Sequence, residues 1–250
     1  MAVIRLDLAY DGSGFRGFAR QPRVRTVEGV LLEALERVMR RRPRLSVAGR
    51  TDAGVHAEGQ VVSFRAEEDP ERLQRALNGM LAPEVVIRRA RRAPNGFDAR
   101  HSATAREYRY RIRVGGLPSP FTSRYEWHRP GEHRLGAMRR AAGLLEGEHD
   151  FRSFCRPPSD GSPTVRRLER LAVRREGDLL FVRARANAFL HQMVRSLVGT
   201  LVAVGEERMD PGAMPQVLWA RSRAAAGPIA PSDGLVLLRV HYGVRSRTHP

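Results

Sequence analysis

The chain has 250 residues, of which 44 are Lys or Arg and 27 are Asp or Glu, so its net charge is +17 and its isoelectric point lies near 11.5. This excess does not fit a generic metabolic enzyme and indicates an anionic partner, with nucleic acid as the first candidate and an anionic membrane surface as the second. A single cysteine, Cys155, excludes an intramolecular disulfide and a zinc site built from several cysteines.

The N-terminal part of the chain predicts the order β-α-β-β-α-β. Residues 3–10 alternate between apolar and polar side chains, as in a half-buried strand. A helix is expected to begin after Thr26, which suits the N-cap position. The remaining elements are predicted as strands at 45–48, 60–64 and 84–90 and a helix at 70–80. This order is typical of ferredoxin-like and RNA-recognition-like domains.

A second unit of the same kind, with insertions, is predicted for the rest of the chain. Residues 104–114 alternate and are rich in Tyr and Arg, which favours a long strand. The other expected elements are a loop at 115–130, a helix at 133–145, a loop at 155–164, a hairpin of 165–173 and 179–186 around Gly177, helices at 189–204 and 211–220, and a strand at 235–240. We therefore predict an α+β fold of two RNA-recognition-like halves, residues 1–102 and 103–250.

No feature of the sequence indicates export, a membrane span or a bound metal. No cationic, apolar leader follows Met1, and no apolar run is long enough to cross a bilayer, so we expect a soluble, cytoplasmic protein. The eight histidines lack the spacing of metal ligands. Neither a phosphate-binding P-loop nor a dinucleotide fingerprint is present.

The first motif is the stretch 48–64, which reads AGRTDAGVHAEGQVVSF. Glycines between two apolar runs predict a turn between strands, and loops of this kind often present catalytic groups. Asp52 is the candidate acid, although an Asp followed by Ala-Gly also suits an ordinary turn. Glu58 is the other carboxylate of the motif, and its place next to Gly59 predicts that it is exposed.

The second motif is ANAFLHQMVR at 186–195. Helical periodicity places Leu190, Met193 and Val194 on the buried face, together with Leu197 and Val198. His191 and Arg195 are four residues apart and are expected to share another face. Both could be solvated there. Arg195 follows Val194 closely, however, and if it is partly buried it needs an anionic partner, for which Asp52 is the candidate.

The third motif is AREYRYR at 105–111. Strand periodicity places Tyr108 and Tyr110 on one face and Arg109 and Arg111 on the other. Tyrosines between arginines suit an ordinary sheet, and they also suit stacking on an unpaired base.

These three strings resemble the motifs of the tRNA pseudouridine synthase TruA family. Weaker similarities at 11–18, 147–154 and 234–237 extend the resemblance over nearly the whole chain. The resemblance implies that Asp52 is the nucleophile, that Arg195 pairs with it and that Tyr108 packs on the target base. It also implies that Arg50 helps to hold the flipped nucleotide and that Leu237 lies on a terminal strand lining the pocket.

The family's fold is an extended, mostly antiparallel mixed sheet with helices on one face. The implied reaction converts uridine to pseudouridine in the anticodon stem-loop of tRNA, at uridines 38, 39 and 40, without a cofactor. The implied assembly is a homodimer. A stacked base must be flipped out before it can react. Whether the carboxylate attacks C1′, adds to C6 or takes the C2′ proton is open at this stage.

Two other functions remain as alternatives. A non-catalytic RNA-binding protein with two RNA-recognition-like units would explain the charge and the fold, but the aromatic motif of such modules is not evident. A nucleic-acid glycosidase would share the flipping of the base. Product analysis separates the three, because they yield isomerised uridine, unchanged RNA and an abasic site, respectively.

Overall fold

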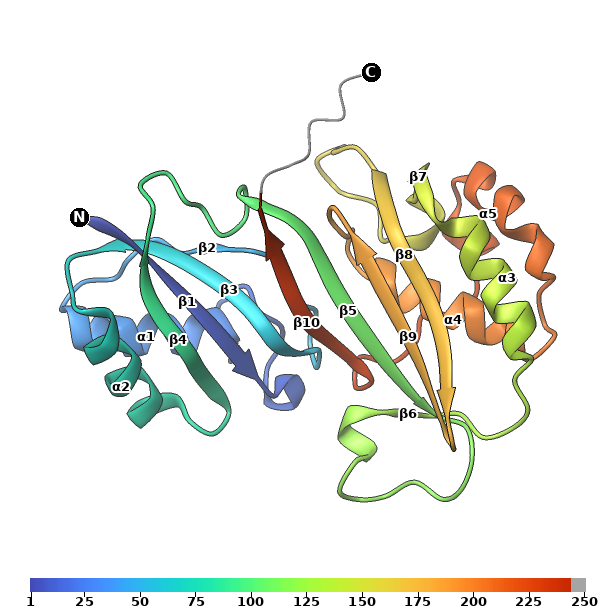
Figure 1. Ribbon diagram of the computed structural model, residues 1–250, viewed down its shortest axis with the longest axis horizontal. Coiled ribbons are helices and arrows are strands. Elements are labelled where there is room, and N and C mark those ends of the chain that lie inside the picture. The colour runs from blue at the N-terminus through green and yellow to red at the C-terminus, as the bar shows by residue number, and fades with distance from the viewer. Residues whose placement is uncertain (244–250) are drawn as a thin grey trace. The chain divides into compact units, whose positions relative to one another are not determined.

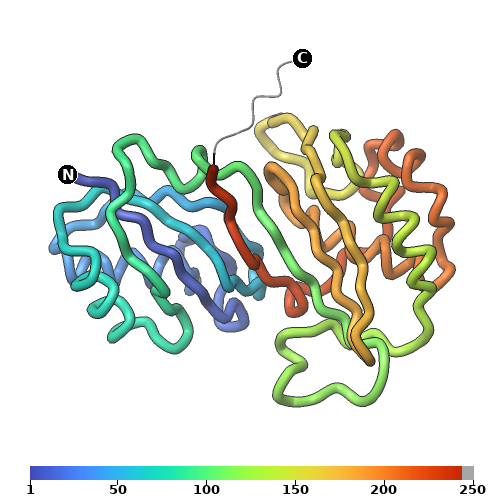
Figure 2. Tube along the Cα trace, in the orientation of Figure 1, coloured from blue at the N-terminus to red at the C-terminus, as the bar shows by residue number. Residues whose placement is uncertain are grey.

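The computed structural model describes residues 1–243 and divides the chain into two compact units (Figures 1 and 2). Of the described residues, 1–106 and 237–243 form the first unit, and 107–236 form the second. The division differs in two respects from the one expected, because the boundary lies after residue 106 and not after residue 102 and because the last strand changes unit. The last strand leaves the C-terminal half of the sequence and joins the sheet of the first unit.

The first unit has the predicted order β-α-β-β-α-β. Its elements are β1 (Ala2–Tyr10), α1 (Val27–Met39), β2 (Ser46–Val47), β3 (His56–Ala66), α2 (Pro70–Leu81) and β4 (Val85–Ala93). The strands lie in the order β4-β1-β3-β10, where β10 (Leu235–Tyr242) comes from the C-terminal part of the sequence, and β2 pairs with β3. Strand β1 is antiparallel to both β3 and β4. This contains the strand order 4-1-3 of a split β-α-β unit, and both β2 and β10 pair with β3.

Local sequence explains why these elements form and where they begin. Ile4, Leu6 and Leu8 alternate along β1 and are fully buried, as are Leu31, Leu35, Leu73 and Leu77 of the helices. Thr26 caps α1 as predicted, since its side-chain oxygen accepts the Gly29 N–H at 3.2 Å. Helices α1 and α2 pack against each other, and α1 passes behind the strands of this unit in Figure 1.

The second unit combines a smaller sheet with three helices in its described residues. Its elements are β5 (Ala103–Arg113), β6 (Trp127–His128), α3 (Leu135–Leu145), β7 (Gly147–Asp150), β8 (Val165–Glu176), β9 (Leu179–Ala186), α4 (Met193–Gly205) and α5 (Met214–Ala220). The strands lie in the order β5-β9-β8-β7. Strand β6 pairs with β5 in parallel, whereas β8 is antiparallel to β7 and β9. The α+β class and the mixed, mostly antiparallel pairing are thereby confirmed.

Two short strands were not expected from the sequence. Strand β6 lies inside the predicted loop 115–130 and has two residues, and β7 has the polar sequence Gly-Glu-His-Asp. Neither segment alternates between apolar and polar residues, so neither shows a sign of a strand in its sequence. Both segments form strands because each pairs with a longer strand. Among residues 1–243, no helix is long and apolar enough to cross a membrane.

An ion pair at the end of α4 predicts a measurable dependence of stability on acid. Arg129 donates to the Glu206 carboxylate at 2.5 and 3.0 Å, and Arg208 donates to it as well. The hydrogen bonds from Arg129 have the largest effect on the pKa of Glu206. Together with those from Arg208 they outweigh the opposite effect of burial and lower this pKa from 4.5 to about 2. Because the pKa is depressed in the folded state, the stabilisation exists above pH 4.5 and is lost as the pH falls toward 2.

We expect the free energy of unfolding of wild type to fall by on the order of 2 kcal/mol more than that of Glu206→Gln between pH 5 and pH 2. Urea unfolding curves recorded over this pH range measure the difference. Glu84→Gln is the matched control, because Glu84 also pairs with an arginine but is exposed, and such pairs contribute little. Identical acid dependence in wild type and Glu206→Gln would contradict the assignment.

Candidate functional site

The Asp52 loop runs from Ala48 to Val55 and joins β2 to β3. It turns back on itself at Asp52, whose carbonyl accepts the Val55 N–H at 3.2 Å. Gly54 has φ +79°, a conformation that glycine adopts readily and other residues do not. The predicted turn is present. It is shorter than expected because β3 begins at His56, four residues before the predicted strand start at Gln60.

Neighbouring glycines allow a second segment to lie directly against this loop. A Cβ added to Gly12 would lie 2.1 Å from the Val55 carbonyl oxygen, so only glycine fits there. The Phe18 N–H donates to Thr51 O at 3.0 Å, and the Gly54 N–H donates to Phe15 O at 3.3 Å. The loop is therefore fixed by backbone contacts with residues 12–18 on either side of Asp52.

Arg106 fastens the start of the Asp52 loop, a role that sequence reasoning missed. Its guanidinium group is buried and donates to Ala48 O through Nε at 3.0 Å and Nη2 at 2.7 Å. The same group donates to the carbonyls of Arg100 and Ala103 at 2.8 and 3.3 Å. One signal was present in the sequence: Arg106 has the strand parity of the buried tyrosines, and a buried guanidinium group needs acceptors.

The side chains predicted for the site in the first unit differ in exposure. Asp52 is half-buried, Arg50 is exposed and Leu237 is fully buried in β10. Glu58 is exposed, as predicted. His56 is buried, with Nδ1 at 3.0 Å from both the Gly12 amide nitrogen and an Asp11 carboxylate oxygen, so it closes the loop beside the glycine contact.

Tyr108 lies on β5 with the alternation that the sequence predicted. Tyr108 and Tyr110 are buried, and Arg109 and Arg111 on the opposite face are half-buried. The Tyr108 ring meets the Phe189 ring edge-on, at 5.2 Å between centroids. Tyr110 donates its hydroxyl proton to Pro231 O at 2.8 Å. The two tyrosines therefore have different environments although they share one face.

The helix that carries Arg195 begins later than predicted. Helix α4 starts at Met193, after Gln192 in a left-handed conformation with φ +62°, so the expected start at Phe189 is wrong. His191 therefore precedes the helix and does not share a helical face with Arg195, and Leu190 is half-buried rather than part of the apolar face. The periodicity continued into a segment whose backbone turns sharply, and composition alone does not reveal that turn.

Arg195 is the one residue of α4 that is not classed as buried, and it remains half-buried. Its Nε donates to Ala230 O at 2.8 Å, while the Ala230 N–H donates to Arg195 O at 3.1 Å. This reciprocal pair holds Arg195 against Ala230. The expectation of partial burial was correct.

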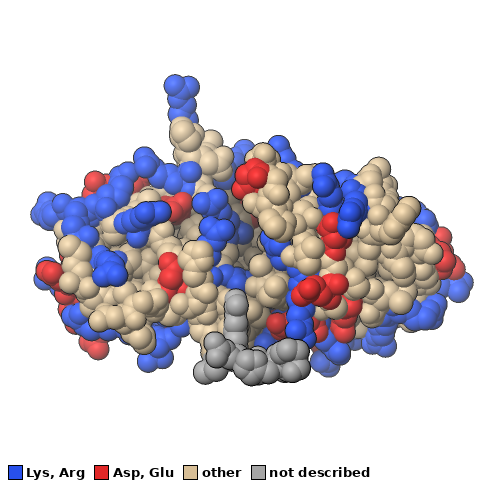
Figure 3. All heavy atoms as spheres, turned by 90° about the horizontal axis from the view of Figure 1, so that it is seen from above, with Lys and Arg blue, Asp and Glu red and all other residues tan. Residues whose placement is uncertain are grey.

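The five candidate residues belong to different units. Asp52, Arg50 and Leu237 lie in the first unit, and Tyr108 and Arg195 lie in the second. The ion pair between Asp52 and Arg195 therefore stays a prediction. Arginine side chains are spread over the surface of each unit on the face that Figure 3 shows.

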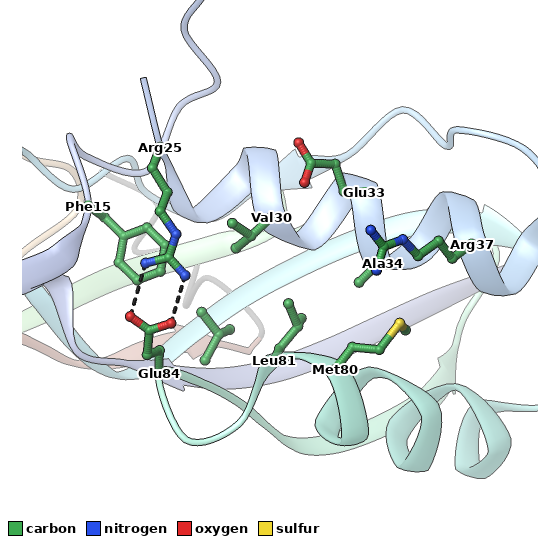
Figure 4. Close-up of a pocket in the computed structure, with 10 residues that line it drawn as sticks. Phe15, Arg25, Val30, Glu33, Ala34, Arg37, Met80, Leu81 and Glu84 are labelled. Carbon is green, nitrogen blue, oxygen red and sulfur yellow. Dashed lines mark hydrogen bonds and ion pairs between the residues drawn. The ribbon is translucent and has the colours of Figure 1, made fainter. Parts of the chain in front are cut away.

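A groove in the first unit is lined by other residues (Figure 4). It is an open groove of about 530 Å³, adjoining solvent included, beside α1 and the end of α2. At one end Arg25 stacks on the Phe15 ring at 4.5 Å and forms two hydrogen bonds with Glu84, at 2.9 and 2.6 Å. The groove's described lining contains none of the candidate residues, so it gives no support to a catalytic role there.

Comparison with known proteins identifies the family. Residues 8–102 and 141–243 match the family model described as tRNA pseudouridine synthase. The chain belongs to the tRNA pseudouridine synthase family. Members of this family are isomerases, so the predicted enzyme class is confirmed. The matched ranges include Asp52, Arg195 and Leu237, whereas Tyr108 lies between them.

Full-length relatives extend this result. The chain is 42% identical to tRNA pseudouridine synthase A of Moorella thermoacetica, over 97% of this chain and all of the relative. It is 43% identical to the protein of the same name from Methylobacterium nodulans, over 97% of this chain and 96% of the relative. It is 40% identical to that from Thermotoga maritima, over 97% of this chain and all of the relative. These matches confirm the TruA family resemblance.

Among solved structures, the archaeal box H/ACA sRNP Nop10–Cbf5 complex aligns with 80% of this chain and 44% of that chain. The identity is 14% and the TM-score is 0.36, a level of similarity that supports no conclusion.

Proposed function

We propose that the protein converts uridine to pseudouridine in the anticodon stem-loop of tRNA, at uridines 38, 39 and 40. The observation that carries the proposal is the family match, which includes the Asp52 loop. The target positions come from the resemblance of the motifs to the TruA family. A tRNA substrate also accounts for the net charge of +17, because arginines neutralise phosphates along the RNA backbone.

The reaction breaks the C1′–N1 bond, turns the base and joins C1′ to C5. It needs no oxidant and no energy source, so no cofactor is required. Asp52 is proposed as the nucleophile. Attack at C1′, as in retaining glycosidases, addition to C6 and removal of the C2′ proton all require an ionised carboxylate at this place.

The other residues hold the nucleotide and the carboxylate. Arg195 stabilises the negative charge of Asp52 and orients it. Arg50, which is exposed beside Asp52, holds the flipped nucleotide through its phosphate. Tyr108 stacks on the base, and Leu237 supplies an apolar contact at the pocket wall. We also propose a cytoplasmic homodimer in which one tRNA contacts both subunits.

Tritium release from tRNA labelled at uridine C5 tests this proposal, because C5 loses its hydrogen only when it is joined to C1′. Nucleoside analysis of the product distinguishes the alternatives. Pseudouridine supports the proposal, unchanged tRNA bound by the protein indicates a non-catalytic RNA-binding protein, and abasic sites indicate a glycosidase.

Substitutions at Tyr108 separate the role of its ring from that of its hydroxyl. If the ring only stacks, Tyr108→Phe retains substantial activity, and Tyr108→Ala loses about 1–3 kcal/mol of base contact. If the hydroxyl also transfers a proton at C5, Tyr108→Phe is nearly as slow as Tyr108→Ala and still binds tRNA normally. Single-turnover rates and tRNA binding decide between these outcomes. Wild-type rates in both variants would leave Tyr108 as a core residue packed on Phe189.

A further inference from the structure

A buried chain of hydrogen bonds underlies the Asp52 loop. It joins Tyr10 at the end of β1 and Gln60 on β3 to Thr51 of the loop. All three side chains are buried, with exposed fractions of 5% for Tyr10, 0% for Gln60 and 7% for Thr51. The Tyr10 hydroxyl lies 2.8 Å from Thr51 Oγ1. Gln60 Nε2 donates to Gly49 O at 2.7 Å and to the Tyr10 hydroxyl at 3.3 Å. The loop is thus held on both sides of Arg50.

The two bonds of Gln60 within this chain of hydrogen bonds have defined donors and acceptors. Its Oε1 accepts the Val61 N–H at 3.1 Å, so its Nε2 must face the Gly49 carbonyl. The Tyr10 oxygen accepts from Gln60 and also shares a hydrogen bond with Thr51 Oγ1, in which either hydroxyl can donate. Burial outweighs the hydrogen bonds to Thr51 and Gln60 and raises the pKa of Tyr10 to about 12, so this hydroxyl keeps its proton at neutral pH.

These hydrogen bonds act on Thr51, the residue that precedes Asp52. Thr51 is held at two atoms, since its side-chain oxygen meets Tyr10 and its carbonyl accepts the Phe18 N–H at 3.0 Å. With both atoms fixed, the peptide between Thr51 and Asp52 has little freedom to rotate. The direction in which the Asp52 side chain leaves the backbone is determined by that peptide.

We propose that Tyr10 and Gln60 are positioning residues that fix the Asp52 carboxylate for reaction through Thr51. The inference rests on the proposed catalytic role of Asp52. A displaced nucleophile still permits tRNA binding but reaches the near-attack geometry less often, so the loss falls on kcat and not on KM. Gln60 lies within the first motif but was given no role there, because Tyr10 and Gln60 come from different strands and meet only in the folded unit.

The test measures kcat, KM and tRNA binding for Tyr10→Phe, Thr51→Val and the double variant in the pseudouridine assay. Each single variant is expected to lower kcat about tenfold or more, with KM and the Kd for tRNA within about twofold of wild type. The double variant is expected to be no slower than the slower single variant, because both substitutions remove the same bond. Thr51→Ser keeps the hydroxyl and is expected to restore kcat.

Tyr242→Phe is the matched control. Tyr242 belongs to the same unit and donates its hydroxyl proton to Ala99 O at 2.7 Å, away from the loop, so its loss is expected to leave kcat unchanged. Thermal unfolding shows whether each variant is folded at the assay temperature. If Tyr10→Phe is not, the comparison of Thr51→Val with Thr51→Ser decides the question.

Three results are distinguishable. Wild-type kcat in Tyr10→Phe and Thr51→Val, or a double variant whose losses multiply, would overturn the positioning role. Equal kcat in Thr51→Val and Thr51→Ser would do the same. Failure of the wild-type protein to form pseudouridine in any tRNA would instead overturn the proposed function, since no variant is needed for that observation.

Discussion

Asp52→Asn is expected to fold, to bind tRNA and to lose pseudouridine formation by on the order of a thousandfold or more. The substitution keeps the size and the turn-forming tendency of the side chain, and it removes the charge that each proposed route requires. The contacts that hold the loop come from the backbone, Tyr10, Gln60 and Arg106, so the loop is expected to keep its shape. Single-turnover tritium release measures the loss.

Asp69→Asn is the matched control for this substitution. Asp69 lies in the same unit and caps α2 by accepting the Arg72 N–H at 2.8 Å. Asn caps a helix about as well as Asp, so the control is expected to retain stability and activity. Turnover by Asp52→Asn at the wild-type rate would remove Asp52 as the nucleophile, and loss of tRNA binding would point to a folding defect.

The Asp52 loop shows how far the sequence predicts this site. Glycines and a carboxylate between two apolar runs indicate a turn that presents an acid, and the structure has that turn. The Tyr10–Gln60 contact could not be predicted in the same way. It depends on the antiparallel register in which Leu8 pairs with Gln60 and Tyr10 with Ala57, and that register includes an irregularity between the two pairs.

Helix α4 shows a different limit. Its apolar periodicity was correct for Met193 onward, and the prediction failed only before that residue. Gln192 has a positive φ that nothing in its residue type requires, so the helix start depends on tertiary contacts. Strand β7 was not predicted for a related reason. Its polar residues form a strand only because β8 provides the partner.

The α+β order of the first unit was predictable because each element carried its own local signal. Thr26 was predicted as an N-cap and accepts the Gly29 N–H. Asp69 caps α2 in the same way, by accepting the Arg72 N–H. The association of β10 with the first unit lacked such a signal. A terminal strand can join either neighbouring sheet edge with the same alternation, so the division into 1–102 and 103–250 did not anticipate it.

Arg195→Met is expected to lower pseudouridine formation by about a hundredfold while the protein stays folded. The methionine side chain replaces the apolar stem of the arginine, so the packing of α4 is largely retained. What is lost is the positive charge proposed to stabilise and orient the Asp52 carboxylate, together with the hydrogen bond from Nε to Ala230 O. The rate is measured under single-turnover conditions, with tRNA binding determined separately.

Two further variants separate the loss of charge from the loss of the Ala230 contact. Arg195→Lys keeps the charge without the planar donor and is expected to be faster than Arg195→Met. Arg139→Met is the control for the hydrogen bond alone, because Arg139 on α3 also donates Nε to a backbone carbonyl, that of Val173, at 3.0 Å. The control is expected to keep wild-type turnover. If Arg195→Met were as active as Arg139→Met, Arg195 would have a structural role against Ala230 and Asp52 would need another charge partner.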